Sequence, residues 1–305
     1  MVEIDAVLLD VDDTLYPVTS GFSDHRNGEV ICKFMVEHLS FESAESAKIL
    51  RDEYFQPAKL HLVYIRRLSR VQGRDQLNLS RSVVDLEVIH FNYTSAGPCR
   101  TPRRYHSTMK GLTIATEEGR LPKPFKQEEL GQYWADHCDF AKFIRADPRQ
   151  IEVIRSLAQD VGLKMAVFTN SPRKYALRCL EVLGVREFFP DDHVFAVEDV
   201  LPACKPQPEA FKAVLDAIGA VPERTVMFED SMKNIRACKA LGIHTVLVHE
   251  AEGGEAALLH DTPIRDDPAV DAVLKDLSET PSLLPCLWKK RFEAAKPSAS
   301  CPKGP

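Results

Sequence analysis

Three aspartates stand directly after a short apolar run near the start of the chain. Residues 6–17 read AVLLDVDDTLYP, so Asp10, Asp12 and Asp13 follow four apolar residues closely. Carboxylates are rarely buried unless they are paired or bind a metal ion. Asp10 and Asp12 are two residues apart, and in an extended chain such side chains face the same way. One carboxylate is then placed to attack an electrophile while the other exchanges a proton.

Polar residues also follow three later apolar runs and complete a set that can do chemistry. They are Thr169-Asn170-Ser171, Lys205 and Glu229-Asp230-Ser231. Each alone has an ordinary explanation, because a serine or aspartate can cap the next helix and a single lysine usually faces solvent. On successive strands of a parallel sheet, however, such residues meet at one edge, where ligands bind. The combination therefore favours one shared site.

The acidic members of this set predict a metal site. Asp10, Asp12, Glu229 and Asp230 would crowd negative charge into one crevice, and like charges do not all stay ionised unaided. A hard divalent cation with oxygen ligands resolves this repulsion, and Mg²⁺ is the expected ion. The histidines show no ligand spacing, so none is assigned to the metal.

The remaining members of the set fit phosphoryl transfer. An aspartate such as Asp10 can form a covalent aspartyl-phosphate. The hydroxyl of Thr169 and the N–H groups that follow it, beginning with Asn170, can bind phosphate oxygens. Lys205 can offset the charge that builds on the transferring group. We therefore expect a Mg²⁺-dependent enzyme that acts on a phosphorylated substrate.

Short apolar runs bounded by turn residues predict the strands that position these groups. The predicted strands are Ala6–Leu9, Met165–Phe168, Val194–Ala196, Thr225–Phe228 and Thr245–Val248. Helical patterns lie between most of them, in residues 171–184, 208–219 and 234–242. In the first of these, Ser171 is the expected N-cap and Pro172 the first helical residue. Strands alternating with helices predict an α/β fold with a doubly wound parallel sheet.

The gap between the first two strands is too long for a loop and contains helical patterns of its own. We expect residues 1–17 and 145–278 to form the core, residues 18–144 an inserted helical cap, and residues 279–305 a disordered tail. Residues 66–104 hold many arginines and no lysine. This atypical insertion is interpreted first as a solvated loop, with a disordered basic loop or a phosphate-attracting flap as alternatives.

The composition narrows the classes of partner. The chain has 305 residues and a net charge of −6, which disfavours a nucleic-acid binder. It contains no apolar run long enough for a membrane span, and its N-terminus predicts no secretory signal. The eight cysteines form no CxxC pair, which favours reduced thiols and a cytoplasmic location. The arginines of residues 66–104 lack the interleaved aromatic residues that nucleic-acid sites use. The oligomeric state is not predicted.

Four short motifs, taken together and in order, resemble those of the haloacid dehalogenase (HAD) superfamily phosphatases. They are DVDDT at residues 10–14, Thr169 with Asn170, Lys205 with Pro206, and Glu229 with Asp230. The resemblance implies a Rossmann-like core with a helical cap. It also implies a Mg²⁺ site, whose ligands are Asp10, Asp12 through its backbone carbonyl, and Asp230 with Glu229 beside it.

The same resemblance implies a role for each catalytic residue. Asp10 is the nucleophile, and Asp12 is the general acid and base. Thr169 binds the phosphoryl group, with Asn170 beside it, and Lys205 orients the nucleophile and the phosphate. Dehalogenases of the superfamily lack an acid at the position of Asp12, so this residue favours hydrolysis of phosphate esters.

Longer segments resemble the pyrimidine 5′-nucleotidase group of plants and fungi. They include DVDDTLYP, YHSTMKGL and FTNSPRKYALRCLEVLGV, within residues 5–62 and 105–248. The resemblance implies a nucleoside 5′-monophosphate as substrate. Expected cap contacts to it are Tyr105, His106 and Thr108, with Ser107 and Lys110 nearby. The sequence departs from the group at Asp13, where Asn or Gly is commoner, and in residues 66–104.

Two alternatives remain open at this point. A sugar-phosphate mutase resembling β-phosphoglucomutase would carry the same four motifs. A protein that binds a phosphorylated ligand without turnover would result if residues 66–104 disrupt the cap or plug the crevice. Release of inorganic phosphate separates the phosphatase from both.

Overall fold

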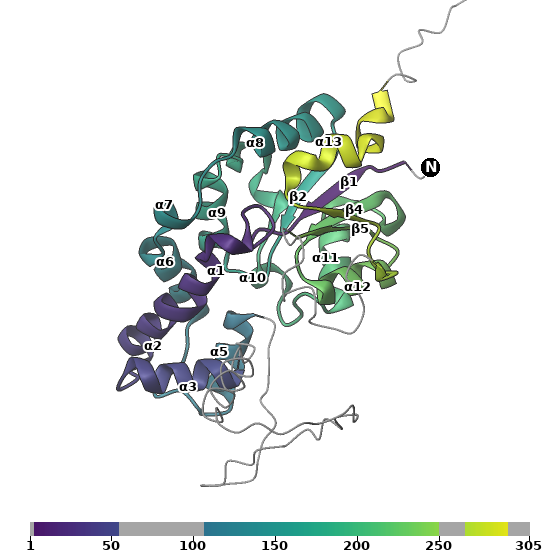
Figure 1. Cartoon of the computed structure of the whole chain (residues 1–305). Coiled ribbons are helices and arrows are strands. Elements are labelled where there is room, and N and C mark those ends of the chain that lie inside the picture. Colours follow the sequence, from purple (N-terminus) through teal and green to yellow (C-terminus); the bar gives the residue numbers. More distant parts are fainter. Residues whose placement is uncertain (1–2, 55–106, 250–265, 292–305) are drawn as a thin grey trace, which may run out of the picture.

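The computed structural model describes residues 3–54, 107–249 and 266–291. A six-stranded parallel sheet of order β3-β2-β1-β4-β5-β6 lies at its centre (Figure 1). The strands are β1 (Ala6–Leu9), β2 (Lys164–Phe168), β3 (Val194–Phe195), β4 (Thr225–Glu229), β5 (His244–Val248) and β6 (Ala272–Leu274). The predicted fold class is confirmed, and each predicted strand is found to within one residue at either end. Strand β6 was not predicted.

Side chains of the strands alternate between two hydrophobic clusters, one on each face of the sheet. Val7 and Leu9 of β1 belong to one cluster, and Ala6 and Leu8 belong to the other. Both faces must therefore be covered, which explains why the strands are apolar runs without a polar side.

Helices supply that cover. On the face of Leu8, α11 contributes Phe211, whose ring contacts the Phe168 ring edge-on at 5.4 Å between centroids. The helices that follow β2 in the chain are α9 (Arg173–Val182), α10 (Val197–Val200), α11 (Pro208–Ile218), α12 (Met232–Ala240) and α13 (Thr280–Leu283), and α8 (Pro148–Arg155) precedes β2.

The central position of β1 decides where the site forms. Leu9 pairs with Val167 of β2 on one side and with Phe228 of β4 on the other. The residues that follow these strands are consequently neighbours, and the backbone N–H of Asp10 donates to the Phe228 carbonyl at 3.0 Å. Residues far apart in sequence thus meet at the carboxyl edge of the sheet.

A group of helices lies between β1 and β2 in the chain, as the long gap between them predicted. It comprises α1 (Phe22–His25), a π-helical turn (Arg26–Val30), α2 (Ile31–Leu39), α3 (Ala44–Tyr54), α5 (Thr108–Glu117), α6 (Gln127–His137) and α7 (Phe140–Phe143). Helices α2, α3 and α5 extend away from the sheet beyond the carboxyl end of β1 (Figure 1). The predicted domain boundaries at residues 17 and 144 remain a prediction.

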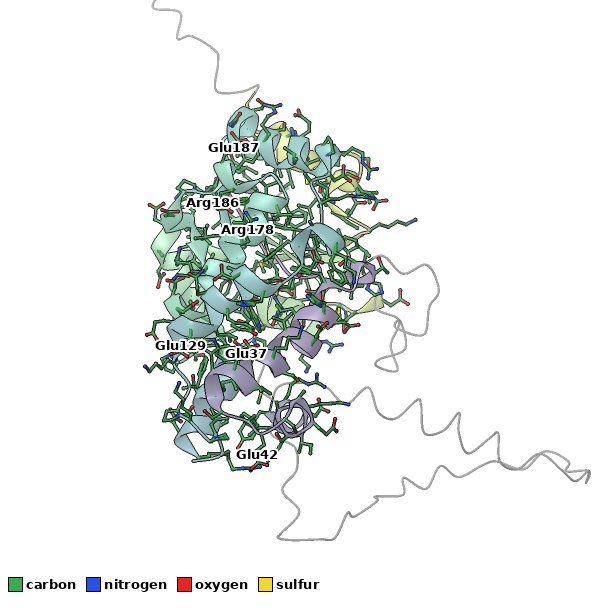
Figure 2. The ribbon with its side chains drawn as sticks, turned by 90° about the vertical axis from the view of Figure 1, so that its left-hand side faces the viewer. Glu37, Glu42, Glu129, Arg178, Arg186 and Glu187 are labelled. Carbon is green, nitrogen blue, oxygen red and sulfur yellow. The ribbon has the colours of Figure 1, made fainter. Side chains whose placement is uncertain are left out.

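Helix α6 joins these helices to the core by packing against α9. A Cβ atom at Gly131 of α6 would lie 3.0 Å from the Cβ of Pro172, so a larger residue would crowd this contact and glycine suits the close approach. Figure 2 shows the face that α2, α6 and α9 present, with charged side chains such as Glu37, Glu129 and Arg178. Nowhere in residues 3–54, 107–249 and 266–291 is there a helix with the length and apolarity to cross a bilayer.

Two local expectations are corrected. Pro172, not Ser171, is the N-cap of α9, because the Ser171 hydroxyl is used by another partner described below. The expected disordered tail does not begin at residue 279, since α13 and a 3-10 helix (Pro285–Arg291) follow β6. The segment 66–104, Tyr105 and His106 lie outside the described residues.

The fold makes a testable prediction about stability. Phe211 is fully buried on the sheet, so Phe211→Ala leaves a cavity and should lower the free energy of unfolding by about 3–5 kcal/mol. Ile49 is 64% exposed on α3, and Ile49→Ala should change that free energy by less than about 0.5 kcal/mol. Urea unfolding of both variants measures the difference, and equal effects would contradict the packing described here.

Candidate active site

The residues that follow the strands surround one cavity of about 300 Å³. Among its lining residues are the predicted Asp10, Asp12, Thr108, Thr169, Asn170, Lys205, Glu229 and Asp230, and the unpredicted Arg26, Trp134 and Lys233. The structure therefore brings together the predicted core residues from four separate segments of the chain. It adds to them residues from α6, α12 and the π-helical turn.

A buried lysine holds the centre of the site. Lys205 is 1% exposed, and its Nζ lies 2.7 Å from Asp10 Oδ1 and 2.7 Å from Glu229 Oε2. Burial alone would lower the pKa of Lys205, but the two carboxylates outweigh it and keep the pKa above its usual value. The ammonium is therefore a fixed positive charge directly beside Asp10.

The Asn170 side chain positions this lysine, and the phosphate contact expected of the Asn170 backbone N–H remains a prediction. Its Nδ2 donates to the Lys205 carbonyl at 2.8 Å, and its Oδ1 accepts from the Lys205 backbone N–H at 2.9 Å. This reciprocal pair uses both ends of the amide and fixes the backbone of the loop that carries Lys205. Phosphate binding by the Asn170 side chain thus lacks support in this geometry.

Three carboxylates crowd around a potential cation site. One oxygen from each of Asp10, Glu229 and Asp230 lies within 4.8 Å of the other two. Burial, and then the charge of Glu229, raises the pKa of Asp10 to about 8. The pKa of Asp230 is also raised well above its usual range, by burial and by Glu229. The all-oxygen donor set, whose negative charge Lys205 offsets only in part, fits Mg²⁺.

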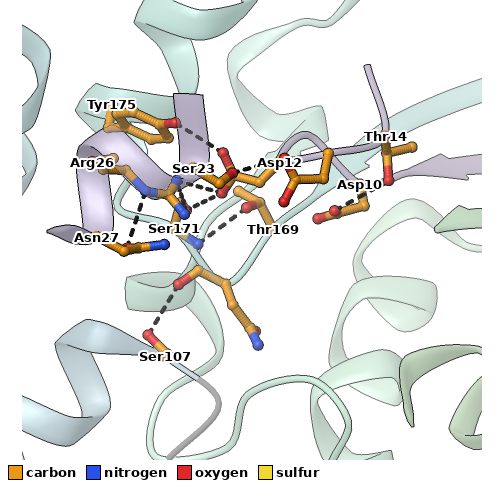
Figure 3. A network of polar contacts seen from close by, with 12 residues as sticks. Asp10, Asp12, Thr14, Ser23, Arg26, Asn27, Ser107, Thr169, Ser171 and Tyr175 are labelled. Carbon is orange, nitrogen blue, oxygen red and sulfur yellow. Dashed lines mark hydrogen bonds and ion pairs between the residues drawn. The ribbon is translucent and has the colours of Figure 1, made fainter. Parts of the chain in front are cut away.

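Asp12 does not join that cluster through its side chain. Its Oδ1 accepts from Tyr16 Oη at 2.6 Å and from Tyr175 Oη at 2.9 Å. Its Oδ2 accepts from Arg26 Nη1 at 2.6 Å and from the Ser171 hydroxyl. In Figure 3 the Asp12 carboxylate points toward these partners and away from Asp10. The expectation that both side chains face the same way is therefore wrong, because the chain turns after β1.

These donors determine the charge of Asp12. Burial by itself would raise its pKa, but the Arg26 charge and the hydrogen bonds from Arg26, Ser171 and Tyr16 outweigh it and lower the pKa below the usual value. Asp12 is consequently an ionised carboxylate in this arrangement. It can accept a proton as it stands, and it must be protonated before it can donate one to a leaving group.

Arg26 is the most important site residue that sequence reasoning missed. It lies at the start of the π-helical turn, and its guanidinium carbon lies 4.9 Å from the Trp134 ring centroid and 4.7 Å from that of Tyr175. π-helical turns are often found at functional sites, but periodicity in the sequence does not reveal them. A single arginine within a polar stretch gave no signal of its own.

Asp13 supports the turn that follows Asp10. It has a positive φ of 60°, and its Oδ1 accepts from the Ser23 hydroxyl at 2.9 Å. Burial, and then the charge of Asp12, raises the pKa of Asp13 to about 6. Asn or Gly adopts this backbone conformation more readily than most residues, and Asp is also tolerated there. The unusual Asp13 is thus compatible with the turn.

Thr169 lines the cavity, and its predicted role in binding phosphate remains a prediction. Its Oγ1 accepts from the Ser171 backbone N–H at 3.0 Å, which leaves its own O–H proton available to donate. Ser107 and Thr108, at the start of α5, also line the cavity, and the Ser107 hydroxyl donates to the Asn170 carbonyl at 3.0 Å. Lys110 instead donates to Gln207 Oε1.

This geometry defines an α/β protein with a parallel sheet, whose site holds a carboxylate beside a buried lysine and an acidic cluster that could bind a cation. The chain belongs to the haloacid dehalogenase-like hydrolases, whose family model matches residues 4–242. The matched region contains all of the site residues named above.

Curated relatives agree with this assignment, and a solved structure shares the fold. The chain is 32% identical over 121 residues to "Phosphorylated carbohydrates phosphatase" of Thermotoga maritima, covering 39% of this chain and 54% of the relative. It is 29% identical over 200 residues to "Probable phosphoglycolate phosphatase" of Pseudomonas putida, covering 66% and 73%. The chain spans about half the length of several curated relatives. CbbY from Rhodobacter sphaeroides, solved in complex with phosphate, has 18% identity and a TM-score of 0.54, over 93% of this chain and 99% of that one, and shares the fold.

The prediction of superfamily membership is confirmed. The finer resemblance to the pyrimidine 5′-nucleotidase group is not supported by these relatives, which are named for other phosphorylated compounds.

The carboxylate cluster predicts a stabilising effect of Mg²⁺. Binding at about 100 times the dissociation constant should raise the free energy of unfolding by about 2.7 kcal/mol, because the ion binds the folded state only. Thermal unfolding with and without MgCl₂ measures this effect. Asp230→Asn should reduce it strongly, whereas the exposed Asp192→Asn should retain it. An equal Mg²⁺ effect in both variants would contradict the proposed ligand set.

The Lys205 ion pairs predict a large effect on stability. Lys205→Met strands Asp10 and Glu229 without their ammonium, which should cost about 3–5 kcal/mol in urea unfolding without Mg²⁺. The double variant Lys205→Met/Glu229→Gln should recover part of the loss. Lys212→Met, on the exposed side of α11, is the matched control. A loss below about 1 kcal/mol for Lys205→Met would show that the pairs are not needed.

Proposed function

We propose that this protein is a Mg²⁺-dependent phosphatase that hydrolyses small phosphomonoesters through an aspartyl-phosphate. The observation that carries the proposal is the buried Lys205 between Asp10 and Glu229, beside Asp230 and Thr169, at the edge of one cavity. Few reactions need three features together: a reactive carboxylate, a fixed positive charge beside it and a site for a metal cation. Phosphoryl transfer does, because its transition state needs positioned charge above all.

Asp10, Thr169 and Lys205 have separate roles in the proposed reaction. An oxygen of Asp10 forms a bond to phosphorus while the bond from phosphorus to the ester oxygen breaks. The O–H of Thr169 and the ammonium of Lys205 face the phosphoryl oxygens and offset their charge. A water molecule then attacks phosphorus, releases inorganic phosphate and regenerates the Asp10 carboxylate. Neither the formation nor the hydrolysis of the aspartyl-phosphate changes an oxidation state.

Asp12 is suited to move the protons of both steps. Its ionised form can take the proton of the attacking water, and its protonated form can supply the leaving oxygen. Its present hydrogen bonds fit the first role directly. Asp10, Glu229 and Asp230 with the backbone carbonyl of Asp12 would hold Mg²⁺. The bound ion would neutralise the phosphoryl oxygens and the crowded carboxylates.

The cavity favours a small and polar leaving group. Trp134 is the only aromatic residue that lines it among the described parts of the chain, and the Arg26 guanidinium lies over its ring. A nucleobase would therefore find no open aromatic face among these residues. Relatives named for phosphorylated carbohydrates and phosphoglycolate agree with a smaller substrate. A nucleoside 5′-monophosphate remains a candidate that the activity screen must include.

Substitutions of the two aspartates test the mechanism. Asp10→Asn should abolish phosphate release, since an amide cannot form the acyl phosphate. Asp12→Asn should lower kcat by about 10²–10⁴, as expected for the loss of general acid–base catalysis. Asp192→Asn serves as the surface control and should keep full activity. Unchanged turnover by folded Asp10→Asn protein would reject the nucleophile.

A phosphate-release screen tests the function itself. The substrates are UMP, CMP, AMP, pyridoxal phosphate, glucose phosphates and phosphoglycolate, each with and without MgCl₂. Steady release that depends on Mg²⁺ supports the phosphatase. An isomerised sugar phosphate with little released phosphate would indicate a mutase, and binding without turnover would indicate an inactive ligand-binding protein.

A further inference from the structure

We infer that Arg26 and Trp134 form a subsite for a second anionic group on the substrate. The inference rests on the proposed phosphatase function and names its substrate class. The substrates are phosphomonoesters whose leaving group itself carries a carboxylate or a second phosphate. The subsite would bind that group while the transferred phosphate sits at Asp10 and Thr169.

Arg26 has the position that such a subsite requires. It lines the cavity, yet it is only 7% exposed, with its guanidinium between the Trp134 and Tyr175 rings. Its Nη1 donates to Asp12 and Ser171, and its Nε donates to Asn27 Oδ1 at 3.3 Å. Its Nη2 has no hydrogen-bond partner within the part of the chain that the structure describes. A planar guanidinium with a free nitrogen suits a carboxylate or a phosphate.

The reason for a substrate anion lies in the charge balance between Asp12 and Arg26. Asp12 accepts from four donors and neutralises Arg26, so any movement of Asp12 toward the ester oxygen would take that carboxylate away from Arg26. A buried cation without a counter-charge is strongly unfavourable. A second anion on the substrate would take the place of Asp12 at Arg26. Substrates that lack it would leave Asp12 held where it is.

Trp134 provides an independent observation for the same subsite. It lines the cavity next to Arg26, and its Nε1 is buried with no hydrogen-bond partner in the described structure. A buried indole N–H normally finds an acceptor. After a small shift of the cavity lining, an oxygen of the bound anion would accept hydrogen bonds from both Trp134 Nε1 and Arg26 Nη2.

Lys233 is the alternative cation that must be distinguished. It lines the same cavity from α12, but its side chain is exposed to solvent. A surface ammonium attracts any anion weakly and without a preferred geometry. Arg26 is buried, stacked and already aligned on a carboxylate, so it is the group expected to select the substrate.

Two matched substrate pairs test the inference. Phosphoglycolate is compared with 2-hydroxyethyl phosphate, which replaces the carboxylate by a hydroxymethyl group. Glucose 1,6-bisphosphate is compared with glucose 1-phosphate and glucose 6-phosphate. The pairs distinguish a carboxylate from a second phosphate as the recognised group. For the wild type we expect kcat/KM to favour at least one doubly anionic substrate by roughly 10- to 100-fold, the worth of hydrogen bonds to a charged group.

Three variants identify the residues responsible. Arg26→Met should reduce the preference to within a few-fold, Arg26→Lys should restore part of it, and Trp134→Phe should lower it while keeping the ring. Lys233→Met should keep it. Equal kcat/KM within both pairs for the wild type, or a preference that survives in folded Arg26→Met, would overturn the inference. If Lys233→Met loses the preference for the doubly anionic substrate and Arg26→Met keeps it, Lys233 and not Arg26 recognises the second anion.

A binding measurement separates failure of the subsite from failure of the proposed function. Calorimetric titration of Asp10→Asn protein with phosphoglycolate and 2-hydroxyethyl phosphate needs no turnover. Tighter binding of phosphoglycolate that is lost in Asp10→Asn/Arg26→Met supports the subsite even if no substrate, p-nitrophenyl phosphate included, releases phosphate. Equal binding of both compounds would refute the subsite and leave the phosphatase proposal to the screen.

Discussion

The ion pairs of Lys205 with Asp10 and Glu229 are the interaction on which the site depends. Three carboxylates, of which Asp10 and Glu229 are buried and Asp230 is half-buried, meet where β1 and β4 end, and without a cation their repulsion would oppose the packing of the sheet. The ammonium removes part of that repulsion and fixes Asp10 in one position. Asn170 in turn holds the Lys205 backbone by two hydrogen bonds, so a residue after β2 controls a charge beside β1.

A second charge balance governs Asp12. Four side chains donate hydrogen bonds to the Asp12 carboxylate, and they come from separate segments of the chain. One of them, Arg26, also carries the positive charge that neutralises Asp12. The two aspartates of the first motif therefore have different environments although they are two residues apart. Asp10 faces carboxylates and a lysine, whereas Asp12 faces hydroxyl groups and an arginine. Different environments let similar groups take different roles in one reaction.

Much of the fold and the centre of the site could be predicted from the sequence. The buried strands are continuous apolar runs, and the motif residues follow them directly, so their meeting point follows from parallel topology. Strand β6 was missed although its three residues, Ala272–Leu274, are all apolar, because so short a run does not distinguish a strand from an apolar loop. The roles of Asn170 and Arg26 could not be predicted, since they depend on partners that only tertiary structure brings near. Residues Tyr105 and His106 lie outside the described residues, so their predicted contacts remain predictions.

The order of the strands also constrains the synthesis of the protein. β1 is made first, but its partner β4 begins at Thr225, more than 200 residues after Leu9. Pairings so distant in sequence carry a large loop-closure entropy and slow folding. On the ribosome, one edge of β1 can pair with β2 only after Phe168 has emerged, and the other edge stays unpaired until β4 has been made. Chaperone binding to this short apolar strand would shield it from aggregation during that interval.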